Sequence, residues 1–400
     1  MTRDTTRRRF LEGSLGAGGA LLLGCSGSGG AGNSGGGTGG GGAGCADPFA
    51  GGELLGVVPF SGEGDSPMET AFNAGLDGRL YTDLSKLDEE HLITDNERFY
   101  IRTRFPDLLA TTADWEITVG GLVAAKAQIA LADLAPLAAP MGAVLLECSG
   151  NGKGARFGML SAAEWSGIPL EKVLSQVEVL PSATAVLVSG FDQHAQPSAK
   201  STPGASWVFT FEQLKQAGAF LATGMNGAPL PLDHGFPVRL VMPGWYGCTC
   251  AKWVDTITLV DDTEAATAQM KEFASRTHQD GVPALARDYK AASMDQAAMP
   301  VRVERWRVGG KTAHRVFGVM WGGYEVTDAL AIRFNPDEPW VPVDVCPAQS
   351  TNRTWTTWSH AWSPAGPGSY EIRLAVLDPS VPTRRLDSGF YVRRVTLSGL

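Results

Sequence analysis

The spacing of apolar residues predicts both strands and helices in the first part of the chain. Residues 114–123 (DWEITVGGLV) and 252–261 (KWVDTITLVD) alternate with the period of a strand, and residues 183–190 (ATAVLVSG) form a β-branched apolar run. Residues 161–177 and 209–223 instead carry apolar side chains at helical spacing, the first interrupted by Pro169. The pattern predicts an α+β domain over residues 53–297.

From about Pro300 the pattern changes to short alternating runs. They cover residues 301–308, 315–323, 354–362, 370–378 and 390–397, with Gly, Pro and Asp turns between them. This spacing is typical of a β-sandwich, so we expect a second, all-β domain over residues 298–400. Its Trp and Tyr residues at alternate positions are most simply core aromatics.

The N-terminus has the pattern of an export signal. Residues 6–11 (TRRRFL) match a twin-arginine signal, and residues 22–25 (LLGC) match a lipoprotein cleavage site. The apolar run between them is too short to span a membrane. We therefore expect a signal peptide over residues 1–24, a lipid anchor at Cys25, and a periplasmic or cell-surface protein. The alternative is a disordered basic tail with a chance LLGC.

Composition narrows the classes of partner. Residues 25–52 are rich in Gly, Ser and Ala, which predicts a flexible tether. The 400-residue chain is 44% hydrophobic, enough for two packed domains. Its formal net charge is −9, and no Lys/Arg run occurs beyond the first ten residues. Nucleic acid is therefore not an expected partner.

The six cysteines do not form a familiar metal-binding pattern. No CxxCH haem motif occurs, and no four cysteines have the spacing of a zinc or iron–sulfur site. In an oxidising compartment Cys45, Cys248, Cys250 and Cys346 can form disulfides, whose pairing the sequence leaves open.

Cys148 stands apart, at the end of an apolar run and before a glycine-rich loop (LLECSGNGKG, residues 145–154). Lys153 and Arg156 bring positive charge that favours a thiolate, which suits a soft metal carrying an anionic cofactor. The loop is not a P-loop, because glycine follows Lys153. A buried structural cysteine and a catalytic cysteine paired with histidine remain alternatives.

Five motifs taken in order give the chain a family resemblance. They are residues 98–106 (RFYIRTRFP), 147–154 (ECSGNGKG), 163–174 (AEWSGIPLEKVL), 232–254 (LDHGFPVRLVMPGWYGCTCAKWV) and 286–290 (ARDYK). Together they resemble the sulfite oxidase family of molybdopterin-dependent oxidoreductases, here a bacterial, exported form without a haem domain. The resemblance runs from about residue 90 to the C-terminus. It implies a molybdenum–molybdopterin cofactor and an immunoglobulin-like dimerisation domain, hence a homodimer.

The resemblance also assigns site residues. It makes Cys148 the thiolate ligand of molybdenum and gives the cofactor-binding set as Cys148, Arg104, Asp192, His234, Arg239, Cys250 and Lys252. It gives the substrate-pocket set as Arg102, Tyr289, Lys153 and Trp165, with Arg393 as an arginine contributed by the second domain. Taken singly, each of these has a plainer interpretation as a surface ion-pair partner, a turn residue or a core aromatic.

Two positions depart from the family pattern. Lys153 stands where sulfite oxidases usually have arginine, and Arg104 stands where they have histidine. Lysine keeps the charge but loses the bidentate geometry of arginine, which predicts weaker sulfite binding or a different substrate. Cys248 and Cys250 also lie in the cofactor loop, where the family more often has Ala, Arg or Ser.

The resemblance implies oxidation of a small oxyanion, sulfite first, to sulfate by oxo transfer. Without a haem motif of its own, the chain is expected to pass electrons to a separate c-type cytochrome. One alternative is an exported sulfoxide reductase with the same cofactor, although residues 300–400 favour the sulfite-oxidising branch. Another is a lipid-anchored binding protein without enzymatic activity.

Overall fold

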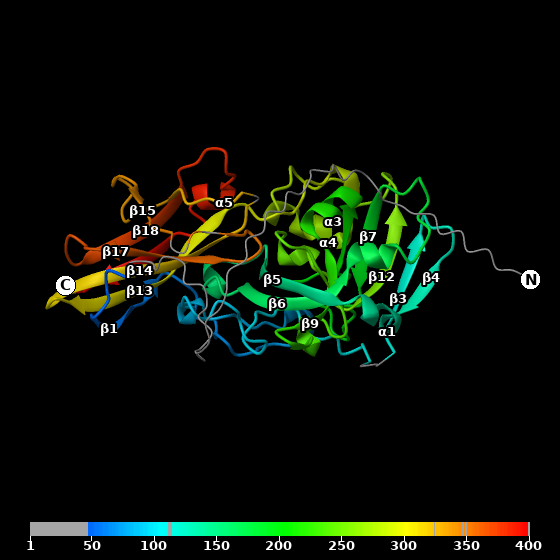
Figure 1. The fold of residues 1–400 in the computed structure, drawn as a ribbon, viewed down its shortest axis with the longest axis horizontal. Helices are drawn as coiled ribbons and strands as arrows, with labels where there is room; N and C mark the ends of the chain where they lie inside the picture. Colours follow the sequence, from blue (N-terminus) through cyan, green and yellow to red (C-terminus); the bar gives the residue numbers. More distant parts are fainter. Residues whose placement is uncertain (1–46, 111–113, 324, 346–347, 349, 399–400) are drawn as a thin grey trace, which may run out of the picture. The chain divides into compact units, whose positions relative to one another are not determined.

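β-Sheets make up most of the structure, with a few short helices between them (Figure 1). The computed structural model describes residues 47–110, 114–323, 325–345, 348 and 350–398. The predicted signal peptide, Cys25, most of the predicted tether, Cys45 and Cys346 lie outside the described residues. Helices are fewer than the predicted α+β class suggests.

Two sheets form the first half of the described chain. One has the order β4-β3-β12-β7-β8, with bounds Ala127–Ala130, Glu116–Gly121, Val254–Val260, Ala185–Gly190 and Ser206–Thr210. The other has the order β10-β9-β6-β5, with β11 also on β9, and bounds Ala228–Pro229, Phe220–Met225, Leu160–Pro169, Ala139–Glu147 and Arg239–Val241. All pairs are antiparallel except β3 with β12. The three strands predicted in this half are confirmed as β3, β7 and β12.

The helix predicted over residues 161–177 is wrong for most of its length. Residues 160–169 form β6, which pairs with β5 on one side and β9 on the other, and only Leu170–Leu174 form a helix, α2. β5 pairs along residues 160–167 and β9 along residues 165–169, and residues 160–163 are fully buried. This tertiary environment outweighs the helical spacing. Pro169 ends the strand and precedes the helix.

The helix predicted over residues 209–223 is confirmed for its central part, α3 (Phe211–Ala217). Thr210 and Gln213 form a capping box at its start, and Gly218 ends it with a left-handed backbone (φ 64°). The chain then enters β9. The other α-helices are α1 (Leu131–Leu134), α4 (Ala268–Phe273) and α5 (Arg384–Asp387).

Two further antiparallel sheets contain the strands predicted after residue 300. One has the order β1-β13-β14-β17, with bounds Glu53–Val58, Ala297–Val308, Lys311–Trp321 and Thr356–Trp362. The other has the order β16-β15-β18-β19-β2, with bounds Val341–Pro342, Leu330–Arg333, Gly368–Val376, Arg393–Leu397 and Phe60–Ser61. Trp362 of β17 stacks on Phe334 and meets Tyr370 of β18, so the two sheets share a core. The immunoglobulin-like class of this part stays a prediction.

The N-terminal strands β1 and β2 belong to these C-terminal sheets. β1 pairs with β13 (Figure 1), and β2 pairs with β19. The sequence boundary at residue 298 assigned residues 53–61 to the first domain, but their hydrogen bonds are with the second.

Candidate cofactor site

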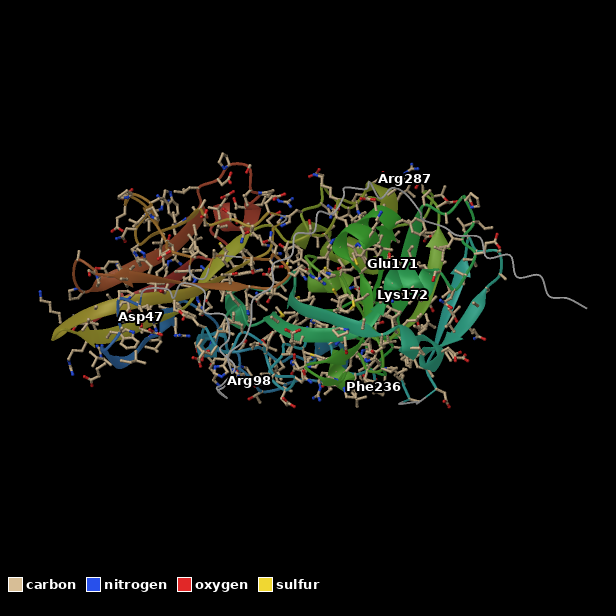
Figure 2. The ribbon with its side chains drawn as sticks, in the orientation of Figure 1. Asp47, Arg98, Glu171, Lys172, Phe236 and Arg287 are labelled. Carbon is tan, nitrogen blue, oxygen red and sulfur yellow. The ribbon has the colours of Figure 1, made fainter. Side chains whose placement is uncertain are left out.

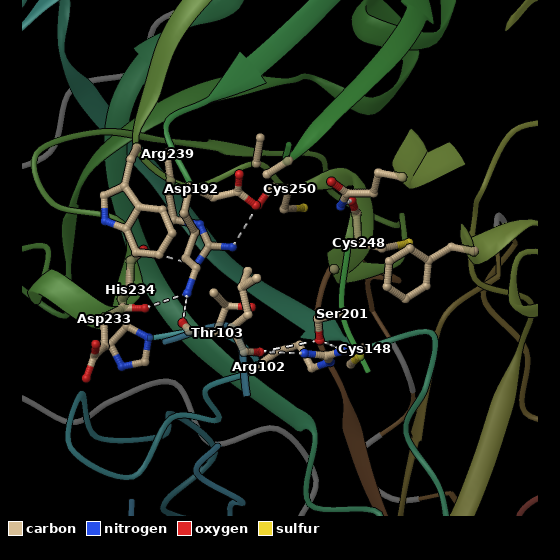
Figure 3. Close-up of a pocket in the computed structure, with 18 of the residues that line it drawn as sticks. Arg102, Thr103, Cys148, Asp192, Ser201, Asp233, His234, Arg239, Cys248 and Cys250 are labelled. Carbon is tan, nitrogen blue, oxygen red and sulfur yellow. Dashed lines mark hydrogen bonds between the residues drawn. The ribbon is translucent and has the colours of Figure 1, made fainter. Parts of the chain in front are cut away.

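A pocket of about 860 Å³, which includes space open to solvent, lies among loops of the first half (Figure 3). Its lining comes from the segment before β3, the residue after β5, the loop between β7 and β8, the turns around β11, and α4. The lining includes Arg102, Cys148, Asp192, Ser201, Asp233, His234, Arg239, Cys248, Cys250, Lys252, Gln269, Glu272 and Phe273. Loops that are far apart in sequence therefore bring charged and thiol groups together.

Cys148 is held by its backbone at the end of β5. Its N–H donates to the Met159 carbonyl (3.0 Å), and its carbonyl accepts from the Asn151 N–H (2.8 Å). The Asn151 side chain closes the loop by accepting from the Met159 N–H at 3.1 Å. The thiol is free and its residue is only 4% exposed, yet it lines the cavity. A buried thiol that faces open space is suited to bind a ligand.

Arg239 and Lys252 bring two buried positive charges to the cavity. Arg239 donates to the carbonyls of His234 (3.1 Å) and Cys250 (3.3 Å), and its Nε has no partner among the described residues. Lys252 donates to the carbonyls of Thr103 and Asp233. Burial lowers the pKa of both groups. No carboxylate of the described chain forms an ion pair with either one, so an anion bound here would satisfy them.

His234 is neutral at physiological pH. Its Nε2 lies 3.0 Å from the Asn96 carbonyl, which can only accept, so this nitrogen carries the proton. Burial, followed by the charges of Lys252 and Arg239, lowers its pKa to about 3. The side chain thus offers the site a neutral imidazole.

Two further cations lie close to the thiol. Arg102 lines the cavity and donates to the Ser201 hydroxyl (2.9 Å) and the Leu76 carbonyl (3.3 Å). Arg276 is exposed, and its guanidinium lies over the ring of Phe273, which lines the cavity. A methyl group placed on Gly150 would touch both the Arg276 guanidinium (3.6 Å) and the Cys148 sulfur (3.8 Å). These contacts place Arg276 at the mouth of the cavity.

Comparison with known families agrees with this geometry. Residues 103–268 match the family model described as oxidoreductase molybdopterin binding domain. This part of the chain is a molybdopterin-binding domain of the sulfite oxidase family.

The relatives of this molybdopterin-binding domain include animal and fungal proteins. Human mitochondrial sulfite oxidase is 29% identical over 199 residues, which is 46% of this chain and 36% of the human protein. The NADPH nitrate reductase of Aspergillus niger is 30% identical over 197 residues, 44% of this chain and 22% of that protein. The chain therefore matches well under half the length of either relative.

A solved structure resembles more of the chain. The sulfane dehydrogenase SoxCD of Paracoccus pantotrophus matches with a TM-score of 0.60 and 19% identity, over 80% of this chain and 82% of that one. At this identity the likeness concerns the fold alone, and it includes residues beyond the molybdopterin-binding domain.

The residues of the cavity fit a molybdopterin group. The unpartnered Nε of Arg239 and the buried ammonium of Lys252 suit an anionic group such as a phosphate, and Cys148 offers one soft metal ligand. No set of three His, Cys, Asp or Glu side chains within the described ranges can hold a bare metal ion. A metal beside Cys148 would thus take most of its ligands from an organic cofactor.

Seven residues predicted for the site line this cavity: Arg102, Cys148, Asp192, His234, Arg239, Cys250 and Lys252. The predicted residue Arg104 lies behind it, where its Nε donates to the Asp233 carboxylate at 3.0 Å. Asp233 also accepts from the Phe105 N–H and itself lines the cavity. Arg104 thus supports the cavity wall through Asp233.

Trp165 and Lys153 are not among the lining residues. Trp165 is buried behind Arg239, 5.5 Å from its guanidinium, and donates its indole N–H to the Val144 carbonyl. It therefore supports a cofactor-site cation instead of forming a substrate wall. Lys153 is partly buried in the loop after Cys148, and its backbone carbonyl accepts from the N–H groups of Gly64 and Arg156.

Tyr289 lies outside the cavity, contrary to its predicted place. It lines a different hollow, together with Trp207 and Trp245. The preceding turn is tied to residues 264–266 by backbone hydrogen bonds, which hold the tyrosine there. Arg287 of the same turn is exposed at the surface (Figure 2).

Arg393 also lies away from the cavity. Its guanidinium forms two 2.6 Å hydrogen bonds with Glu63, donates to the Pro300 carbonyl at 3.0 Å, and stacks over Phe60 at 3.6 Å. These contacts give the Arg393 guanidinium a buried counter-charge and a ring partner, so the fold accounts for its charge without a substrate.

The cysteines of the GCTC turn are buried free thiols, so the disulfides that the sequence left open at Cys248 and Cys250 are not formed. Burial raises the pKa of both thiols. Sequence reasoning missed Ser201, Asp233 and the α4 residues that line the cavity, and Arg276 beside it; apart from Asp233, they lie in segments that carry no motif. The only available signal was the position of Asp233 inside the LDHGFPVR motif.

Proposed function

We propose that the chain is a molybdopterin-dependent oxidoreductase that oxidises sulfite to sulfate and passes the electrons to an external c-type cytochrome. The observation that carries the proposal is the free Cys148 thiol in a cavity lined by Arg102, Arg239 and Lys252. The chain has a formal net charge of −9, so a cluster of cations at one cavity favours an anionic substrate locally.

The residues of the cavity divide between cofactor and substrate. Cys148 would bind the metal, while Arg239, Lys252 and His234 would hold the polar and anionic parts of the pterin. When bound, the molybdenum–molybdopterin group would supply two-electron redox chemistry and oxygen-atom exchange. The overall reaction is balanced by water: sulfite and water give sulfate, two protons and two electrons.

Arg102 and Arg276 would bind and orient the substrate. The planar guanidinium of Arg102 can bind two oxygens of one oxyanion, and its bond to Ser201 fixes its direction. Arg276 adds positive charge at the mouth, which speeds the capture of an anion. Phe273 and the loop containing Ser201 reduce access of water to the bound substrate.

The two alternative functions, a sulfoxide reductase and a binding protein without a cofactor, differ from sulfite oxidation in substrate and in molybdenum content. A sulfoxide reductase with the same cofactor would oxidise a reduced dye when given methionine sulfoxide, and a binding protein would contain no molybdenum.

The test is elemental analysis and steady-state kinetics on purified protein. We expect about one molybdenum per chain and reduction of cytochrome c on addition of sulfite, but not of methionine. Cys148→Ser should abolish turnover while the thermal unfolding midpoint stays close to that of the original protein. Turnover by Cys148→Ser would contradict the ligand assignment.

The proposal includes export by the twin-arginine route, a lipid anchor at Cys25, a periplasmic or cell-surface location and a homodimer. These rest on the N-terminal motifs and the family resemblance. Within the described residues, no helix has the length and apolar character needed to cross a membrane.

A further inference from the structure

A buried arginine from the C-terminal half contacts two segments that adjoin the cofactor cavity. Arg385 of α5 is 8% exposed, and its Nη2 donates to the carbonyls of Ser149 (2.7 Å) and Arg276 (2.9 Å). Ser149 directly follows Cys148, and Arg276 supplies the cation at the mouth. One guanidinium nitrogen therefore joins the Cys148 loop to the segment that carries Arg276.

The position of this guanidinium is fixed from every side. Its carbon lies 4.4 Å from the ring centre of Tyr246 and 4.9 Å from that of Phe390. Its Nη1 lies 3.5 Å from the Glu147 carboxylate. A planar cation held between two rings and a carboxylate has little freedom to turn.

Glu147 extends the same network to the other side of Cys148. It is 1% exposed, and its carboxylate accepts from the Tyr391 hydroxyl (2.9 Å) and the Trp321 indole N–H (3.0 Å). Trp321 lies on β14 and Tyr391 precedes β19, so both donors come from the C-terminal half. The residues on either side of Cys148 are thus both bound by groups of that half.

We propose that Arg385 is a positioning residue of the cofactor site, which fixes the Cys148 loop relative to the Arg276 segment, with Glu147 as its buried counter-charge. Arg385 does not line the cavity, so it acts through the two carbonyls it binds. The inference rests on the proposed cofactor site but not on the identity of the substrate.

The first measurement uses molybdenum-free protein. Cys148 is buried, so alkylation by iodoacetamide requires local opening of its loop. In Arg385→Met we expect the alkylation rate of Cys148, followed by mass spectrometry, to rise about tenfold or more. Alkylation of Cys250 in the same sample, also buried but not bound by Arg385, should change much less.

The second measurement uses molybdenum-loaded protein. The electron paramagnetic resonance spectrum of the one-electron-reduced metal depends on the orientation of its thiolate ligand. Arg385→Met should shift or broaden this spectrum and lower kcat/KM for sulfite about tenfold. Arg385→Lys keeps the buried charge beside Glu147, but its ammonium lacks the planar fork, so it should fold and show a smaller shift of the same kind.

Matched controls come from an exposed Glu–Arg pair in the same half. Arg394 of β19 donates to Glu371 of β18 at 2.9 Å. Within the described part of the chain, this pair does not bond to the Cys148 loop. Arg394→Met and Arg394→Lys should leave the Cys148 alkylation rate unchanged.

The positioning role of Arg385 and the proposed function fail in different ways. If Cys148 is alkylated at the original rate in Arg385→Lys and Arg385→Met, and both variants give the original electron paramagnetic resonance spectrum, Arg385 has no positioning role. This holds whatever the activity of the variants. If the original protein binds no molybdenum, the proposed function fails. A raised alkylation rate of Cys148 in the variants would still support the positioning role of Arg385.

Discussion

The candidate site is built at the residue scale from groups whose ordinary partners are missing. Cys148 lacks a disulfide, and neither Arg239 nor Lys252 forms an ion pair within the described part of the chain. Leaving buried cations without counter-charges costs stability, so their placement around one thiol indicates a bound anion. The apoprotein should therefore gain stability when the cofactor binds.

Arg276 gives a substitution that tests charge at the mouth. Its guanidinium is exposed, so Arg276→Gln should leave the free energy of unfolding within about 0.5 kcal/mol of the original. The KM for sulfite should rise about tenfold at low salt, and the difference should shrink at high salt because exposed charges are screened. Arg287→Gln removes an exposed arginine outside the cavity and serves as the control. An equal rise in KM for both variants would rule out a specific role for Arg276.

His234 gives a pH dependence. Its pKa is about 3 in the folded protein, below its ordinary value of 6.5, so the unfolded chain binds more protons as the pH falls. Its contribution to stability is complete above about pH 6.5 and is lost progressively toward pH 3. At pH 4.5, cofactor-free protein should therefore lose about 2–3 kcal/mol of unfolding free energy through this group. Urea unfolding at pH 7.5 and 4.5 should show a smaller loss in His234→Gln; an identical pH dependence would refute the assignment.

At the scale of elements, the short helix α4 matters more than its length suggests. It carries Gln269, Glu272 and Phe273 into the cavity lining. Its start is fixed by Thr267, whose hydroxyl accepts from the Met270 N–H (3.1 Å) and donates to the Ser206 carbonyl (2.8 Å). The cap thus ties the cavity wall to β8.

Removing this cap should affect both stability and the site. Thr267→Ala should cost about 1 kcal/mol of unfolding free energy, as N-cap losses typically do, and raise the KM for sulfite. Thr210→Ala removes the equivalent cap of α3, which does not line the cavity, and should cost a similar amount without changing KM. If KM changes equally in the two variants, the α4 wall has no specific role.

The sequence predicted the elements unevenly. Strands with clear alternation, such as residues 252–261, were confirmed, because period-2 spacing reports a sheet with one buried face. Residues 160–169 lie between two strands, and their burial on both faces removed that alternation. The short strands β15 and β16 were missed since four and two residues are too few to show a period.

The site was predictable only where motifs carry it. Cys148, His234, Arg239 and Lys252 lie in segments recognisable in the sequence, and all line the cavity. Tyr289 and Arg393 lie elsewhere because the path of the loop and a buried ion pair decide their places. Contacts between residues distant in sequence produce no local pattern from which the position of these side chains could be predicted.

At the scale of the whole molecule, the buried Glu63–Arg393 pair joins segments 330 residues apart in sequence. Breaking a buried pair leaves one charge uncompensated, so Arg393→Met should cost about 3–5 kcal/mol of unfolding free energy. Arg394→Met breaks the exposed Glu371–Arg394 pair and should lower the free energy of unfolding by at most about 1 kcal/mol. Urea unfolding measures the loss of unfolding free energy in both variants. The folded fraction of Arg393→Met should have the same KM for sulfite as the original protein. A raised KM would restore the substrate role predicted for Arg393.

The pairing of β1 and β2 with the C-terminal sheets has a consequence for how the chain is assembled. Ser61 pairs with Arg394, 333 residues later, so the sheet that contains β2 stays incomplete until the chain has been synthesised through β19. Closing so long a loop is slow. Until it closes, the unpaired edge strands can form non-native pairs with other chains. A gene fragment covering residues 298–398 would leave β13 and β19 each without one strand partner, whereas a circular permutant carrying residues 53–61 after residue 398 would restore both pairs.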